Sequence, residues 1–193
     1  MARYDKDHKR QTRERIIEAA GRRLKADGID GSGVSTLMAD AGLTNGAFYA
    51  HFASKEDLVG AAVTEELRRQ TASFLKSVTT REDLAQFVKD YLSPEHRDHR
   101  VDGCPSAALL DELGRCDTAT RRAYTAAMGE LLAKIADVIG DPGPATRVKV
   151  SSAYALMIGT IQLSRTLTDP KLADDILEEG VRNVLRILGL NSP

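Results

Sequence analysis

The sequence contains no tryptophan, only two cysteines and no long apolar run. Aromatic residues make up 5% of its 193 residues, although hydrophobic residues of all kinds reach 42%. Two cysteines in an intracellular chain do not make a disulfide framework. A transmembrane helix needs about 18 or more consecutive apolar residues, and the charged N-terminus lacks the apolar core of a signal peptide. We therefore expect a globular, cytoplasmic protein with no membrane segment.

Net charge is also close to zero, at -1, and by itself excludes no class of partner. Its distribution along the chain is uneven. Residues 1–55 carry ten Lys or Arg against seven Asp or Glu, whereas residues 56–193 carry seventeen against twenty-one. A basic front on an acidic remainder indicates a small anion-binding module attached to a larger body.

Strand signals are missing as well, because no alternating apolar pattern and no internal repeat occurs, and Gly31-Ser32-Gly33 lacks the spacing of a dinucleotide-binding loop. Apolar residues recur instead at helical spacing, which predicts an all-α fold. Residues 1–8 are expected to form a charged arm, and residues 93–103 a loop. The expected helices span residues 9–27, 34–41, 44–52, 54–77, 81–92, 105–115, 118–139, 148–167 and 172–188.

The stretch 42–55 carries the clearest functional signal. Gly42 separates two short helical segments, which is the helix-turn-helix arrangement. At about 100° per residue, Phe48 and Phe52 share the inward face of the second segment. The outward face holds small residues and one amphipathic ring, namely Gly46, Ala47, Tyr49 and Ala50. Such a surface allows close approach to a partner, and the major groove of duplex DNA is the obvious candidate.

At these positions the chain resembles the TetR family of bacterial transcriptional regulators. The residues that carry the resemblance are Gly42, Gly46, Tyr49, His51, Phe52 and Lys55. It is strong over roughly the first sixty residues and only architectural beyond them. The family usually has a Leu-Phe pair where this chain has Arg23-Leu24, so the packing there should differ. The resemblance implies a three-helix DNA-binding domain at residues 1–55 and a ligand-binding and dimerisation domain at residues 56–193.

Each predicted DNA contact follows from the chemistry of its side chain. Thr44 is expected to cap the recognition helix, and Asn45 to reach a base edge, with adenine the geometric favourite. The Tyr49 hydroxyl and the Lys55 ammonium suit phosphate oxygens. Ser35 is expected to cap the preceding helix or to contact phosphate. The nine assigned positions are Ser35, Thr44, Asn45, Gly46, Ala47, Tyr49, Ala50, His51 and Lys55.

Several of the possible DNA contacts leave alternatives open, and Tyr49 could instead be a packed core ring. Ala47 and Ala50 can offer only methyl groups, which pack on thymine methyls, so DNA shape and backbone contacts are expected to contribute much of the selectivity. His51 lies at the edge of the face and can either touch phosphate or pack against the first helix. A basic tail can follow the DNA backbone or simply remain solvated. Its cationic residues are Arg3, Lys6, Lys9 and Arg10.

The last two helices have apolar residues on more than one face. They can pair with the same helices of a second copy, or they can line a core within one chain. In the TetR family they form a dimeric four-helix interface. The resemblance also implies a small-molecule inducer bound within the body, and an apolar one is indicated by the candidate pocket residues Phe87, Tyr91, Cys104, Leu113, Tyr124, Met128 and Met157.

Other chemistry finds little support. Cys104 and Cys116 are too far apart on one helix to form a bridge, which leaves Cys104 as a single reactive thiol or as a buried small residue. The segment with His96, His99 and Asp102 near Cys104 matches no zinc spacing, so neither a metal nor a cofactor is expected. No catalytic signature accompanies the four histidines. The sequence therefore predicts a dimeric repressor that binds a near-palindromic operator and is not an enzyme, the alternative being a helical protein-binding adaptor.

Overall fold

The computed structural model describes the backbone of residues 2–190 and the side chains of residues 7–190. Helices account for every regular element within residues 2–190, which confirms the all-α prediction. None of the helices in that range is both long enough and apolar enough to cross a membrane. The elements in chain order are α1 (Ala2–Asp27), α2 (Val34–Asp40), the 3₁₀ helix η1 (Asn45–Ala50), α3 (Lys55–Ser77), α4 (Arg81–Tyr91), α5 (Pro94–Asp98), α6 (Pro105–Arg115), α7 (Thr118–Ile139), α8 (Pro144–Thr166) and α9 (Pro170–Leu188).

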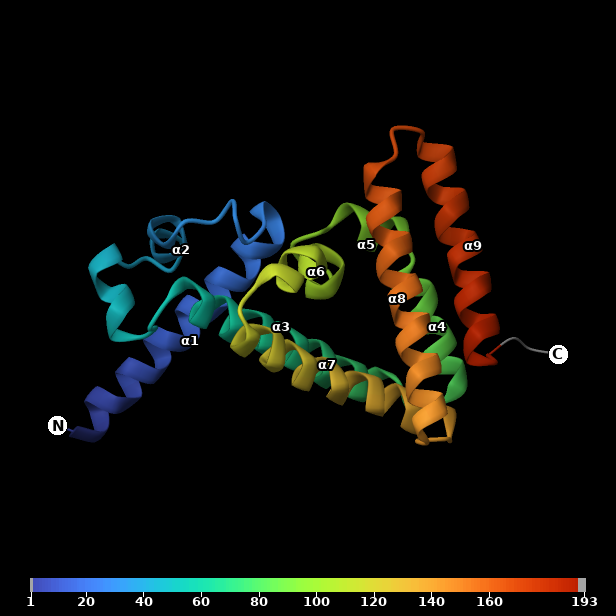
Figure 1. Ribbon diagram of the computed structural model, residues 1–193, viewed down its shortest axis with the longest axis horizontal. Helices are drawn as coiled ribbons and strands as arrows, with labels where there is room; N and C mark the ends of the chain where they lie inside the picture. The colour runs from blue at the N-terminus through green and yellow to red at the C-terminus, as the bar shows by residue number, and fades with distance from the viewer. Residues whose placement is uncertain (1, 191–193) are drawn as a thin grey trace.

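The chain packs around two apolar clusters. One joins α1, α2, η1 and the first half of α3, and it also takes in Leu109 and Leu113 of α6 and Ala127 of α7. We call the part formed by α1, α2 and η1 the head. The other cluster lies among α4, α7, α8 and α9, and we call it the body core. Head and body core lie at opposite ends of the molecule, with α3 and α7 running side by side between them (Figure 1).

The head closes around side chains at helical spacing. Ile16, Ala20 and Leu24 of α1 are fully buried, as are Leu37 and Met38 of α2. Truncating a buried side chain of this size to alanine typically costs about 2–5 kcal/mol. The head therefore holds its three elements together through the predicted inward faces.

Local signals set several boundaries correctly. Ser54 caps α3, because its hydroxyl accepts a hydrogen bond from the Asp57 backbone N–H at 3.2 Å. Pro105 opens α6, and Gly140, with φ +88°, ends α7 in the left-handed conformation that glycine adopts without strain. The predicted bounds of α6 and α7 are therefore those observed.

Other boundaries were predicted wrongly. α1 begins at Ala2, so residues 2–8 continue the helix and are not a separate arm; Met1 lies outside the described residues. The predicted loop 93–103 contains the short helix α5, which Ser93 caps through the His96 N–H. α8 and α9 begin earlier than predicted, at Pro144 and Pro170, since proline suits the first turn of a helix.

Candidate nucleic-acid interface and body core

The turn between α2 and η1 is tight and depends on glycine. Gly42 adopts φ +69°, a conformation that other residues reach only with strain. Next to it, the Leu43 N–H donates to Met38 O at 2.9 Å and closes the turn back onto α2. The chain can therefore leave α2 and enter η1 within a few residues, as a helix-turn-helix requires.

The recognition segment is shorter and more tightly wound than predicted. Residues 44–52 were expected to form one α-helix, but the structure has a 3₁₀ helix at Asn45–Ala50. Thr44 does occupy the capping position, although its side chain accepts no hydrogen bond there. Phe48 and Phe52 are buried and stack with their ring centroids 5.8 Å apart. These two rings hold the short element onto the head, so its other side remains free.

The outward face of η1 is small and exposed, as predicted. Tyr49 is 78% exposed, and its ring makes a T-shaped pair with that of Phe48, with the centroids 5.2 Å apart. A Cβ atom added at Gly46 would meet nothing within 4 Å. Asn45 and Ala50 are exposed, and Ala47 is half-buried. The face therefore presents the hydroxyl of Tyr49 and the amide of Asn45, and its other side chains are small.

Cations from α1 lie near the end of η1, beside His51 and Phe52. The Arg13 guanidinium sits 4.7 Å from the centroid of the Phe52 ring, in cation–π geometry. His51 is half-buried, and its Nδ1 atom is buried with no hydrogen-bond partner among residues 7–190. Burial lowers the pKa of His51, and the nearby charges of Lys9 and Arg13 lower it further. Sequence reasoning missed Arg13, because its proximity to Phe52 depends on how α1 crosses η1.

Two predicted contact residues have other neighbours than expected. Ser35 does not cap α2, since the helix begins one residue earlier at Val34 and Gly33 occupies the capping position. The Ser35 side chain is exposed on the first turn. Lys55 donates from Nζ to Ile29 O at 2.5 Å, which joins the first turn of α3 to the turn after α1. Lys55 therefore stabilises the head in addition to any contact it makes with DNA.

Arg23 replaces apolar packing with an ion pair. Its guanidinium binds both carboxylate oxygens of Asp40 in α2, at 2.6 and 2.9 Å, and Asp27 at 2.8 Å. Hydrogen bonds from Arg23 lower the pKa of Asp40. The expected departure from the usual Leu-Phe pair is therefore a bidentate link between α1 and α2.

The seven predicted pocket residues do not form one group. Leu113 belongs to the cluster beneath the head, and Tyr124 is half-buried against that same cluster. The other five lie in or against the body core: Phe87, Tyr91, Cys104, Met128 and Met157. Cys104 and Cys116 lie at the two ends of α6, and both are free thiols.

Two tyrosine hydroxyls near the start of α6 pair with polar side chains of that segment. Cys104 Sγ lies 3.0 Å from the hydroxyl of Tyr154, and Ser106 Oγ lies 3.0 Å from the hydroxyl of Tyr124. Burial is the main cause that raises the pKa of both tyrosines, so their hydroxyls keep their protons. The body core is therefore apolar with a few hydrogen-bonding groups.

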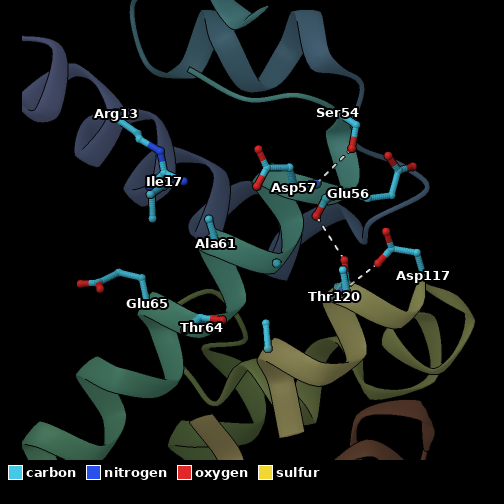
Figure 2. Close-up of a pocket in the computed structure, with 13 residues that line it drawn as sticks. Arg13, Ile17, Ser54, Glu56, Asp57, Ala61, Thr64, Glu65, Asp117 and Thr120 are labelled. Carbon is cyan, nitrogen blue, oxygen red and sulfur yellow. Dashed lines mark hydrogen bonds between the residues drawn. The ribbon is translucent and has the colours of Figure 1, made fainter. Parts of the chain in front are cut away.

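A groove of about 460 Å³ lies elsewhere, where α1, α3 and α7 meet. Figure 2 shows Thr120 at its wall, with its Oγ1 donating to Glu56 O at 3.3 Å and its N–H donating to Asp117 Oδ1 at 2.7 Å. Glu65 and Asp57 add carboxylates to the lining. Because the groove is acidic and none of the seven predicted pocket residues lines it, it does not match the apolar ligand site expected from the sequence.

Comparison with known proteins agrees with this geometry. Residues 16–62 match the family described as bacterial regulatory proteins, tetR family. An uncharacterized HTH-type transcriptional regulator of Lactococcus lactis subsp. lactis is 22% identical over 173 residues, which cover 86% of this chain and 87% of the relative. The HTH-type transcriptional regulator AcrR of Shigella flexneri is 36% identical over 58 residues, covering 30% of this chain and 27% of that protein.

Solved structures show the same fold over most of the chain. The crystal structure of a TetR family transcriptional regulator from Cytophaga hutchinsonii superposes with a TM-score of 0.73 at 20% identity, and it covers 93% of this chain and 96% of that one. The family match spans the helix-turn-helix, where Tyr49 stands exposed and Phe48 lies buried. Residues 16–62 therefore belong to the tetR family of bacterial regulatory proteins, and the protein is a transcriptional regulator with the fold of that family's solved structures.

Proposed function

We propose that the protein is a repressor that binds a near-palindromic DNA operator as a homodimer and leaves it when a small molecule enters the body core. Operator binding of this kind belongs in the bacterial cytoplasm. The exposed, bulk-free face of η1 is the observation that carries the proposal, because it allows the backbone to approach base edges closely.

Within this proposal the contacts divide by chemistry. Asn45 reads a base edge, while Ala47 and Ala50 pack against thymine methyls. Tyr49 places its exposed hydroxyl on phosphate. The remaining positions, namely Ser35, Thr44, Gly46, His51 and Lys55, contribute backbone approach or phosphate contacts. Arg13 and Lys9 add positive charge near His51.

The outer surfaces of α8 and α9 support dimer formation. These helices pack side by side at the end of the molecule away from the head (Figure 1). One exposed stripe of α8 has small residues in the middle and larger apolar residues at the ends, namely Val148, Ser152, Ala155, Gly159 and Leu163. On α9, Leu172 is exposed and Ile176 half-buried at matching spacing. A second copy of the same pair would cover this surface.

Selection of bound duplexes from a random pool tests the proposal. We expect one near-palindromic sequence to be enriched, with half-sites about one helical turn apart. Tyr49→Phe should then weaken binding to all duplexes alike, whereas Asn45→Ala should change which bases are preferred at one position per half-site. If the pool yields no bound duplex even at low salt, the chain is a protein-binding adaptor and the proposal fails.

A further inference from the structure

One buried hydroxyl in the body core has no partner. Tyr91, the last residue of α4, is 5% exposed, and its hydroxyl makes no hydrogen bond among the described residues. The hydroxyls of Tyr154 and Tyr124, by contrast, pair with Cys104 and Ser106. Buried polar groups are nearly always paired with protein, water or a ligand. Within the described body, Tyr91 is therefore the tyrosine whose hydroxyl lacks a well-formed hydrogen bond, because its neighbour Cys104 already lies 3.0 Å from the Tyr154 hydroxyl.

The surroundings of Tyr91 indicate the chemistry of that molecule. Its ring centroid lies 6.1 Å from that of Phe87 and 6.0 Å from that of Tyr154. Burial raises the pKa of Tyr91, so the hydroxyl keeps its proton and can donate. Arg165 is a cation whose charge acts on the Tyr91 hydroxyl, and its guanidinium binds three backbone carbonyls, those of His96, Arg97 and Ala107. An anionic ligand would have to compete with these three carbonyls for the Arg165 guanidinium, which favours an uncharged ligand.

We propose that the Tyr91 hydroxyl donates the orienting hydrogen bond to the ligand of the body core, and that this ligand is a small, uncharged, mostly apolar molecule with a carbonyl oxygen. The inference rests on the proposed function, in which the body binds a small molecule. Phe87 and Met128 are half-buried against the same core, and these two side chains move to admit the ligand.

Hydrogen bonds connect Tyr91 to the head. His96 Nδ1 donates to Tyr91 O at 2.7 Å, and His96 Nε2 accepts from the Cys104 N–H at 3.0 Å. The adjacent carbonyl, Gly103 O, accepts from Lys25 Nζ of α1 at 3.3 Å. A Cβ added at Gly103 would lie 2.5 Å from the His96 ring, so the loop and the ring touch closely. Movement of Tyr91 on binding is thereby passed to α1.

Lys25 fixes the α1 end of this chain of hydrogen bonds. It is 5% exposed, and its ammonium also binds Glu66 Oε2 of α3 at 2.5 Å. A buried ammonium keeps its partners, because separating them would leave charge in a low-dielectric interior. A shift of Gly103 therefore moves Lys25 and α1, or breaks their contact.

Thermal unfolding of the full-length protein tests the unpaired hydroxyl. Tyr91→Phe should raise Tm by about 2–4 °C, because it removes an unsatisfied group without opening a cavity. Tyr154→Phe is the matched control and should lower Tm, since its hydroxyl pairs with Cys104. A fall in Tm for both variants would show that Tyr91 is already satisfied by buried water, and the proposal would be overturned.

Two probes of the same shape test the ligand class. Acetophenone carries a carbonyl oxygen, and α-methylstyrene has a methylene group in its place. Acetophenone should raise the Tm of the natural protein more than α-methylstyrene does, and the difference should vanish in Tyr91→Phe. Equal shifts with the two probes, or no shift with either, would overturn the assignment.

Release of DNA tests the connection to the head. Acetophenone should weaken binding of the natural protein to the selected duplex. The double variant Lys25→Met with Glu66→Gln, which leaves no unpaired buried charge, should show the same thermal shift with acetophenone but stay bound to DNA. Release equal to that of the natural protein would overturn the connection. Failure of the natural protein to bind any duplex would instead overturn the proposed function, whereas intact DNA binding with a Tyr91-independent shift would overturn this inference alone.

Discussion

Lys55 shows how one side chain can serve both the head and the proposed interface. Its ammonium uses one N–H on Ile29 O, which leaves two N–H groups for a phosphate. Lys55→Met removes this hydrogen bond, so it should lower the free energy of unfolding by about 1 kcal/mol and lower Tm accordingly. It should also reduce the slope of log affinity against log salt by about one per subunit. Binding titrations between about 50 and 200 mM salt measure the slope.

Lys76 offers the matched control for Lys55. It lies in the last turn of the same helix and is exposed, far along α3 from the head. Lys76→Met should leave both Tm and the salt slope unchanged. A Lys55→Met protein with lower Tm and an unchanged slope would show that the ammonium serves the fold only.

His96 should make stability depend on pH. Burial lowers the pKa of His96 below its ordinary 6.5, and its two ring nitrogens already bond to Tyr91 O and the Cys104 N–H. As pH falls below about 6.5, the unfolded chain takes up a proton that the folded protein resists, so stability falls. Urea unfolding should therefore show a larger loss between pH 7.5 and 5.5 for the natural protein than for His96→Gln.

The comparison needs a second histidine as a control. His99 is exposed, and His99→Gln should retain the pH dependence of the natural protein. The pKa of His51 is also lowered, but His51 is present in all three proteins and so cancels in the difference. Identical pH profiles for the natural protein and His96→Gln would contradict the assigned role of the imidazole.

The small outward residues of η1 matter for its function as much as its two buried rings do for its position. Gly46→Leu places a side chain where nothing lies within 4 Å, so stability should change by no more than about 0.5 kcal/mol. The same side chain would hold the element away from base edges. Affinity for the selected duplex should fall about tenfold or more, which is ~1.4 kcal/mol. Gel shift and thermal unfolding measure the two effects.

Gly42→Ala should behave in the opposite way within the same motif. The position has φ +69° and open space, so the cost is backbone strain of about 1–2 kcal/mol and not a clash. Stability should fall, while DNA affinity at a temperature well below Tm should be largely kept. If Gly46→Leu lowers Tm but keeps its affinity for DNA, η1 does not approach DNA closely.

At the scale of the whole molecule, the exposed stripe of α8 predicts how the dimer forms. Gly159 lies in the middle of that stripe, and a Cβ added there would meet nothing within 4 Å. Gly159→Arg should therefore leave the fold of one chain intact but place a charged side chain in the dimer interface. Size-exclusion chromatography with light scattering should show the molar mass falling from two chains to one, and binding to the full operator should weaken.

Gly129 allows a matched control on another helix. It is an exposed glycine of α7 with nothing within 4 Å of an added Cβ, and it lies outside the α8 and α9 surface. Gly129→Arg should keep the dimer and its DNA affinity. If both arginine variants remain dimeric, the subunits associate through some other surface.

Much of the fold could be predicted because its signals are local. Ser54, Pro105 and Gly140 mark helix ends through their own backbone and capping chemistry, and each stands where a helix does begin or end. The inward positions of Phe48 and Phe52 follow from helical spacing alone. The outward position of Tyr49 follows from the same spacing, so the sequence alone indicates the candidate interface.

Only the tertiary structure decided which distant groups meet. Lys55 binds Ile29 O, Arg23 binds Asp40, and Leu113 packs beneath the head and away from the other predicted pocket residues. The sequence also could not predict that the Tyr91 hydroxyl lacks a partner among the described residues, because pairing depends on the surroundings and not on the residue itself. Periodicity and capping act over a few residues of one helix, so they determine the elements. Hydrogen-bond satisfaction depends on how those helices cross, which no local pattern records.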